Sequence, residues 1–158
     1  MNDISDLDAA YIAGLFDGEG TLRIFPAHRK KSKKIQIVMQ TTTRIGMTDQ
    51  RIILWLKWCI GTGNIHVRPA KGRNKSVFTI YWSIKPATEL MRRILPFLKV
   101  KRRHAELLLN WSELQRAYRE SSLGTPGVRG RFIPFPQQQS RQEIVTELND
   151  LNKRGSHL

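Results

Sequence analysis

The chain has 158 residues, with 27 Lys and Arg against 13 Asp and Glu, a formal net charge of +14. This length suits one domain with its own core, and a single cysteine, Cys59, excludes a disulfide scaffold. No apolar run approaches the ~20 residues of a membrane helix, and the acidic N-terminal segment is unlike a signal peptide. We therefore expect a protein of the cytoplasm or an organellar matrix, not secreted, without a membrane or small-molecule partner. Its charge points to nucleic acid.

The positive charge is concentrated in the middle of the chain. Residues 1–20 carry five acids and no base, whereas residues 21–105 carry 20 bases and only two acids. The remaining residues are nearly neutral. So much like charge within segments that look folded costs stability through self-repulsion unless a polyanion relieves it.

The first predicted helix runs from about Leu7 to Phe16, with Ser5 as its cap. Glycines at 18 and 20 are expected to end it. Ala10 and Gly14 lie four residues apart and predict a smooth stripe on which another backbone can pack closely.

Two hairpins and further helices follow. Alternating patterns predict strands at 21–26 and 35–43, then at 64–69 and 77–84, with basic turns at 28–34 and 70–76. We expect Ile65 and Val67 to face inward. Predicted helices occupy 49–59, capped by Thr48, then 87–95, and a long stretch ending near 120. Residues 121–139 look irregular, and Ser140 to Glu143 reads as a capping box that opens a last helix.

The predicted fold class is therefore α+β. The order αββαββα gives an antiparallel four-stranded sheet with helices on one face, plus C-terminal helices. We expect residues 1–120 to form one core domain and residues 121–158 a loop and helix extension packed on it.

The other sheet face is predicted to be polar. Gln and Arg side chains on a β-ribbon suit the hydrogen-bonding edges of adenine and guanine in the major groove. A solvated face with no partner is the alternative. The residues expected to contact DNA are Arg23, Arg29, Lys31, Lys33, Gln36, Gln40, Thr42, Arg44, His66, Arg68, Lys71, Arg73, Lys75, Thr79, Tyr81 and Lys99.

The end of the first helix is acidic in an otherwise positive protein. Asp17 and Glu19 are hard oxygen ligands, which suit Mg²⁺ and metal-assisted phosphodiester cleavage. An Asp-Gly turn without any role explains the same spacing equally well.

The segment from Ile12 to Gly20, IAGLFDGEG, resembles the motif of the LAGLIDADG homing endonucleases position by position. Ile replaces the first Leu, Phe the Ile, Gly the second Ala, and Glu the second Asp. The order of elements over roughly residues 7–120 fits the same family. Only one copy of the motif is present, so the chain resembles the single-motif members, which act as homodimers.

The resemblance implies a site-specific, intron-encoded DNA endonuclease with a long pseudo-palindromic target. Glu19 and the Gly18 carbonyl would bind Mg²⁺, with Mn²⁺ as a substitute, and Asp17 would be a less direct catalytic acid. Lys101 would stabilise charge or order water, and Gln50 or Arg51 would be the polar helper. The motif helices of two subunits would pack through Ala10, Ala13, Gly14 and Asp17.

Two other functions stay open. The same fold serves non-cleaving DNA- or RNA-binding proteins, such as an intron maturase or a transcription regulator. A ribosomal-type RNA-binding protein is a third interpretation, but it predicts basic tails, and the charge here lies within the folded middle.

Overall fold

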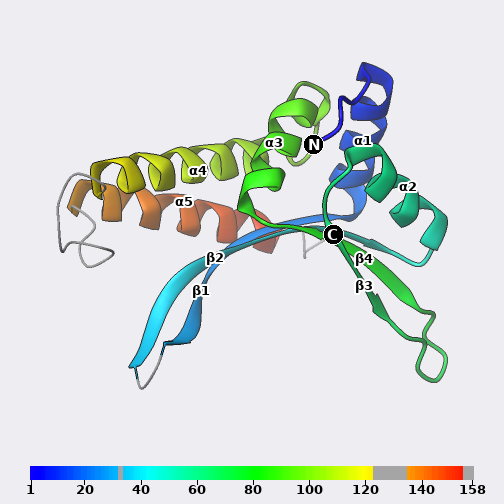
Figure 1. The fold of residues 1–158 in the computed structure, drawn as a ribbon, viewed down its shortest axis with the longest axis horizontal. Helices are drawn as coiled ribbons and strands as arrows, with labels where there is room; N and C mark the ends of the chain where they lie inside the picture. Colours follow the sequence, from blue (N-terminus) through cyan, green and yellow to red (C-terminus); the bar gives the residue numbers. More distant parts are fainter. Residues whose placement is uncertain (32–33, 123–134, 155–158) are drawn as a thin grey trace.

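A computed structural model describes residues 1–31, 34–122 and 135–154 of the chain (Figure 1). Within these ranges the structure describes only the backbone at residues 29–31, 34–37, 118, 119, 121, 122, 135–138 and 154. In the described part, no helix has the length and apolar character that crossing a membrane would require. The element order is helix, two strands, helix, two strands and three further helices, with a short 3₁₀ turn.

The four strands form one antiparallel sheet. They are β1 (Gly20–Lys31), β2 (Lys34–Met47), β3 (Asn64–Arg68) and β4 (Val77–Trp82), in the spatial order β1-β2-β4-β3. Thr43 pairs with Trp82 where the two hairpins join. Beyond that point the hairpins splay apart (Figure 1). The predicted α+β class and the four-stranded antiparallel sheet are confirmed.

The helices cover one face of the sheet, as Figure 1 shows. They are α1 (Asp6–Glu19), α2 (Gln50–Ile60), α3 (Ile84–Ile94), the 3₁₀ turn η1 (Leu95–Phe97), α4 (Arg102–Ser122) and α5 (Phe135–Arg154). Leu22, Ile24 and Ile45 point from the sheet into the core, where they meet Phe16 and Trp111. Burial of these large side chains, each worth about 1.5–3 kcal/mol, stabilises the two layers.

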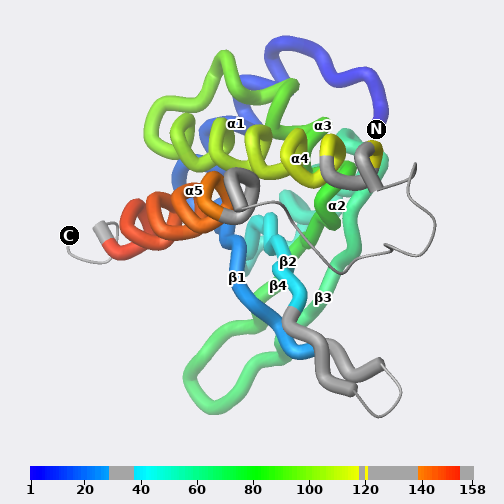
Figure 2. Tube along the Cα trace, turned by 90° about the vertical axis from the view of Figure 1, so that its left-hand side faces the viewer, coloured from blue at the N-terminus to red at the C-terminus, as the bar shows by residue number. Residues whose placement is uncertain are grey.

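Helix α5 lies between α4 and the edge strand β1, and Figure 2 shows the three side by side. Ile144 and Leu148 are buried, and Leu151 packs against the core. The division into a core domain of residues 1–120 and an extension of residues 121–158 stays a prediction.

Several element boundaries differ from the sequence-based ones. Helix α1 continues through Gly18 to Glu19, and its predicted Ser5 cap is confirmed, since the hydroxyl accepts from the Asp8 amide at 3.1 Å. Strand β1 extends to Lys31, and strand β2 begins at Lys34, so together the two strands include most of the predicted basic turn. The charge run hid this extension because lysines and arginines mask the alternation of apolar residues.

Three local predictions were wrong. Asp49, rather than Thr48, caps α2 through the Arg51 amide. Ser140 lies inside α5, which begins at Phe135, so no capping box opens that helix. Ile65 and Val67 on β3, which were predicted to face inward, are exposed instead.

Candidate functional site

The C-terminal end of α1 leads directly into β1, and this junction presents Glu19. Gly20 is buried at the bend, and a Cβ there would collide with the Phe16 carbonyl and ring. A glycine is therefore required for the helix to turn this tightly into the strand. Glu19 is exposed, and a Cβ at Gly18 would meet no atom of the described residues within 4 Å.

Asp17 ties this junction to the segment before α4. Its two carboxylate oxygens accept hydrogen bonds from the backbone amides of Lys99 and Lys101, each at 2.8 Å. Both oxygens are thus occupied within the chain, which leaves Glu19 as the exposed carboxylate at the junction.

Lys101 closes the same junction from the other side. Its ammonium donates to the Phe16 carbonyl at 3.0 Å and to the Asp17 carbonyl at 2.6 Å. A positive group at the last carbonyls of a helix is favoured by the helix dipole. Burial lowers the pKa of Lys101, while the nearby carboxylates of Asp17 and Glu19 oppose this shift.

His104 lies behind this junction on α4. It is buried, and its Nδ1 has no hydrogen-bond partner among the described residues. Burial lowers the pKa of His104, and the positive charge of Lys101 lowers it further, whereas Asp17 raises it. The imidazole therefore favours its neutral form. Sequence spacing gave no reason to connect it with the acidic end of α1.

Glu19 opens onto the polar face of the sheet. It lines a hollow of about 430 Å³ together with five of the residues predicted to bind DNA. The structure thus brings the acidic end of α1 and the basic sheet face into one site. Those five residues are Arg44, His66, Arg68, Thr79 and Tyr81.

Tyr81 organises the centre of this hollow. The Arg44 guanidinium lies over the Tyr81 ring, 5.9 Å from its centroid. The His66 ring meets Tyr81 edge to face, with centroids 6.5 Å apart. Cross-strand pairing of Arg44 with Tyr81 fixes this arrangement on the sheet.

Other predicted contact residues lie around this centre. Arg23 and Thr42 line a second hollow beside α5, and Lys71 and Lys75 line a third near the β3–β4 turn with Arg68. Gln40, Arg73 and Lys99 are exposed, and so is Gln50, in the first turn of α2 but outside the Glu19 hollow. The side chains of Arg29, Lys31, Lys33 and Gln36 lie outside the described residues.

The two layers of the molecule differ in how their charges are paired. Among the described residues, every ion pair lies in the N-terminal segment and the helical layer, for example Arg93 with Asp6 and Arg103 with Glu147. The described bases of the sheet and its β3–β4 turn form no ion pair. They are Arg23, Arg44, Arg68, Lys71, Arg73 and Lys75.

The predicted interface helix carries an exposed apolar strip. Leu7 is 83% exposed and Tyr11 is 49% exposed. Gly14 is also exposed, and a Cβ there would meet no atom of the described residues within 4 Å. Tyr11 packs edge to face on Trp55 of α2, at 5.3 Å. This apolar surface continues on α2, where Leu54 and Trp58 are exposed, and nothing in the sequence pattern indicated this continuation. Ala13 is fully buried in the core of its own chain, so it is not on this surface.

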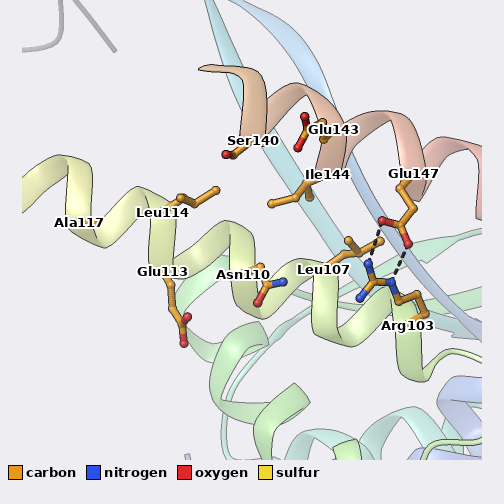
Figure 3. Close-up of a pocket in the computed structure, with 10 residues that line it drawn as sticks. All are labelled: Arg103, Leu107, Asn110, Glu113, Leu114, Ala117, Ser140, Glu143, Ile144 and Glu147. Carbon is orange, nitrogen blue, oxygen red and sulfur yellow. Dashed lines mark hydrogen bonds and ion pairs between the residues drawn. The ribbon is translucent and has the colours of Figure 1, made fainter. Parts of the chain in front are cut away.

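A groove of about 500 Å³ between α4 and α5 has a different character (Figure 3). Glu113, Glu143 and Glu147 line it, and Arg103 bonds to Glu147 at 2.6 Å. These acids make the groove unsuited to a polyanion, in contrast to the sheet face.

No protein-family model matches the sequence, and a search of the curated proteins gives no match either. Solved structures do match. A chain of the LAGLIDADG homing endonuclease I-LtrWI, bound to target DNA, has a TM-score of 0.65 at 16% identity. The alignment covers 93% of the present chain but 46% of that chain, so this protein spans about half its length.

Two further structures are covered more fully. The intron-encoded homing endonuclease I-CeuI, complexed with DNA, has a TM-score of 0.62 at 11% identity, covering 94% of this chain and 69% of that one. The homing endonuclease I-CvuI, in complex with its target in the presence of Ca, has a TM-score of 0.57 at 19% identity. The alignment covers 91% of this chain and 96% of that one. The present chain therefore has the fold of the LAGLIDADG homing endonucleases.

Proposed function

We propose that this protein is a site-specific double-strand DNA endonuclease of the LAGLIDADG type, which acts as a homodimer with a divalent metal. The observation that carries the proposal is the position of Glu19. This exposed carboxylate ends the motif helix and lines the same hollow as Arg44, Arg68 and Tyr81.

Unpaired charge supports DNA as the partner. Several bases of the helical layer, such as Arg92, Arg102 and Arg116, have acidic partners, whereas the described bases of the sheet form no ion pair. Bases without an acidic neighbour are available to phosphates, and counterion release then drives binding. The splayed hairpins extend this surface over a length suited to a duplex rather than a small ligand.

The residues present fit a divalent metal. The described residues contain no cluster of three or more His, Cys, Asp or Glu side chains that could hold a metal alone. Mg²⁺ does not need one, because it is commonly bound by one or two carboxylates, several waters and substrate phosphates. Glu19 and the carbonyl of Gly18 would hold it in the open space at the end of α1, and Mn²⁺ would substitute. Bound there, it would activate water and offset charge on the scissile phosphate.

The neighbouring residues have supporting roles in this proposal. Asp17 and Lys101 fix the end of α1, so that Glu19 keeps one position relative to the DNA. Two N–H groups of the Lys101 ammonium are directed at carbonyls, which leaves one to order a water near the phosphate. Arg44 and Arg68 hold the backbone or a guanine edge next to the cut. Gln50 as a polar helper stays a prediction.

A homodimer would bring two such sites together. The apolar strip of Leu7 and Tyr11 continues onto Trp58, which is 76% exposed. Large apolar side chains that are exposed next to one another are typical of a protein interface. Ala10 and Gly14 within it permit a close helix–helix approach. Asp17, with both oxygens occupied, would border the contact rather than form it.

The test is cleavage of plasmid DNA that carries the native locus of the gene with the intron removed. With Mg²⁺ we expect one linear product, and EDTA should abolish it. Tight, metal-independent binding of the same DNA without cleavage in Mg²⁺ or Mn²⁺ would instead favour the second candidate, a non-cleaving DNA- or RNA-binding protein of this fold.

A further inference from the structure

The C-terminal end of α5 is attached to the edge strand of the sheet. The Asn152 side-chain amide donates to the Leu22 carbonyl of β1 at 3.2 Å. Because no strand among the described residues pairs with that side of β1, its outward carbonyls need other donors. This bond fixes the last turns of α5 at the margin of the polar sheet face.

Residues of α5 and of the sheet together line a hollow of about 740 Å³ at this margin. Asn149, Asn152 and Lys153 come from α5, while Arg23 and Thr42 come from the sheet. These α5 residues are three and four positions apart, so they share one face of the helix. Lys153 is paired with Asp150 at 3.2 Å, and its side chain is 75% exposed.

This hollow is continuous with the one that contains Glu19. Thr21 and Arg44 line both. A polyanion that lies across the sheet next to Glu19 would therefore reach α5 without leaving the same surface. Arg23, Arg44 and Lys153 make the added hollow positive.

We propose that the last two turns of α5 form an additional DNA-backbone site, in which Asn149 and Lys153 bind a phosphate at the outer margin of the sheet. This inference rests on the proposed DNA-binding function. When a β-ribbon enters the major groove, elements beside the ribbon meet the sugar–phosphate backbone that borders the groove. Amide and ammonium donors suit phosphate oxygens, and Asn152 positions them by anchoring α5 to β1.

The experiment measures DNA affinity against salt concentration with a fluorescent random-sequence duplex long enough to span the sheet. Random sequence isolates the binding of phosphates, whose number sets the slope of log affinity against log salt. The variants are Lys153→Gln and Asn149→Asp. Their matched controls are Lys85→Gln on α3 and Asn110→Asp on α4, both exposed in the helical layer. Arg68→Gln reports on the sheet itself.

We expect Lys153→Gln to reduce the slope by about 0.9 for each phosphate that the protein no longer neutralises. Asn149→Asp should weaken binding several-fold, and Asp150→Asn should strengthen it, since an acid that competes with phosphate for the Lys153 ammonium is then removed. The two control variants should bind like the wild type. Circular dichroism would verify that all variants are folded.

If Lys153→Gln and Asn149→Asp behave like their controls while Arg68→Gln lowers the slope, the α5 site is refuted and the DNA-binding sheet stands. If Arg68→Gln also leaves the DNA affinity and its salt dependence unchanged, both the α5 site and the proposed DNA-binding function are refuted. An unchanged affinity in Asp150→Asn would show that the Lys153–Asp150 pair is only structural, and would likewise count against the site.

Discussion

The Asp17 carboxylate accepts the backbone amide of Lys101, while the Lys101 ammonium donates to the Asp17 carbonyl, at 2.8 and 2.6 Å. Each residue thus holds the main chain of the other with its side chain. This reciprocal contact joins segments that are 84 residues apart in the sequence. Glu19 follows two residues later, so the contact fixes the position from which the proposed catalytic carboxylate extends.

Asp17→Asn should loosen this junction. An amide offers one acceptor where the carboxylate offers two, so either the Lys99 or the Lys101 amide is left without its partner. An unsatisfied backbone donor of this kind costs about 1–3 kcal/mol in the free energy of unfolding. Urea unfolding measures this, with Asp3→Asn, an exposed acid outside the network, as control. Equal stability of the two variants would show that the junction does not depend on Asp17.

His104 should make the protein sensitive to mild acid. Burial, together with the nearby Lys101 ammonium, lowers the pKa of His104 below the ordinary value of 6.5. As the pH falls through 6.5, the unfolded chain takes up a proton that the folded chain does not bind, so the free energy of unfolding falls.

His104→Leu removes this proton uptake and should flatten the loss of stability below pH 6.5. Urea unfolding over a pH series measures the effect. Asn110→Leu, an exposed position on the same helix, should keep the wild-type slope. A His104→Leu protein that loses stability with acid as steeply as the wild type would contradict this role of the histidine.

Gly14→Leu should separate folding from dimerisation. A Cβ at Gly14 meets no atom of the described residues within 4 Å, and replacing a helical glycine improves helix propensity by about 1 kcal/mol. The added side chain would, however, block close approach of a second α1. Light scattering should therefore give the 18.3 kDa chain mass instead of twice that value. Ala117→Leu, on an exposed part of α4, should stay dimeric. A dimeric Gly14→Leu protein would place the interface elsewhere.

Tyr81→Ala should weaken DNA binding through Arg44. The ring supports the guanidinium by a cation–π contact, worth about 0.5–1 kcal/mol at an exposed site, or roughly a 2- to 5-fold change in Kd. Fluorescence anisotropy at fixed salt would measure it. Tyr81→Phe keeps the ring and should bind nearly as tightly as the wild type. If Tyr81→Phe is as weak as Tyr81→Ala, the hydroxyl rather than the ring is responsible.

Local sequence rules predicted the parts of the fold that depend on near neighbours. Ser5 caps α1, and Leu22 and Ile24 face the core, because capping and strand alternation involve residues a few positions apart. The position of Glu19 at the end of a helix and next to a sheet followed from the motif and the element order in the same way.

Contacts between distant segments were not predictable. Nothing in the sequence pairs Asp17 with residues 99 and 101, or Asn152 with Leu22, because these contacts exist only after the helices pack on the sheet. The exposure of Trp58 on α2 was not predicted either. Only the packing of α2 shows which of its apolar side chains remain uncovered.

The most direct test of the central claim compares the wild type with Glu19→Gln on plasmid DNA containing the target. The substitution removes the negative charge of the proposed metal ligand but leaves the basic sheet face unchanged. We predict that Glu19→Gln binds the DNA at least as tightly as the wild type and yields no linear product in Mg²⁺. Linearisation by Glu19→Gln at the wild-type rate would contradict the account, because the carboxylate would then have no part in cleavage.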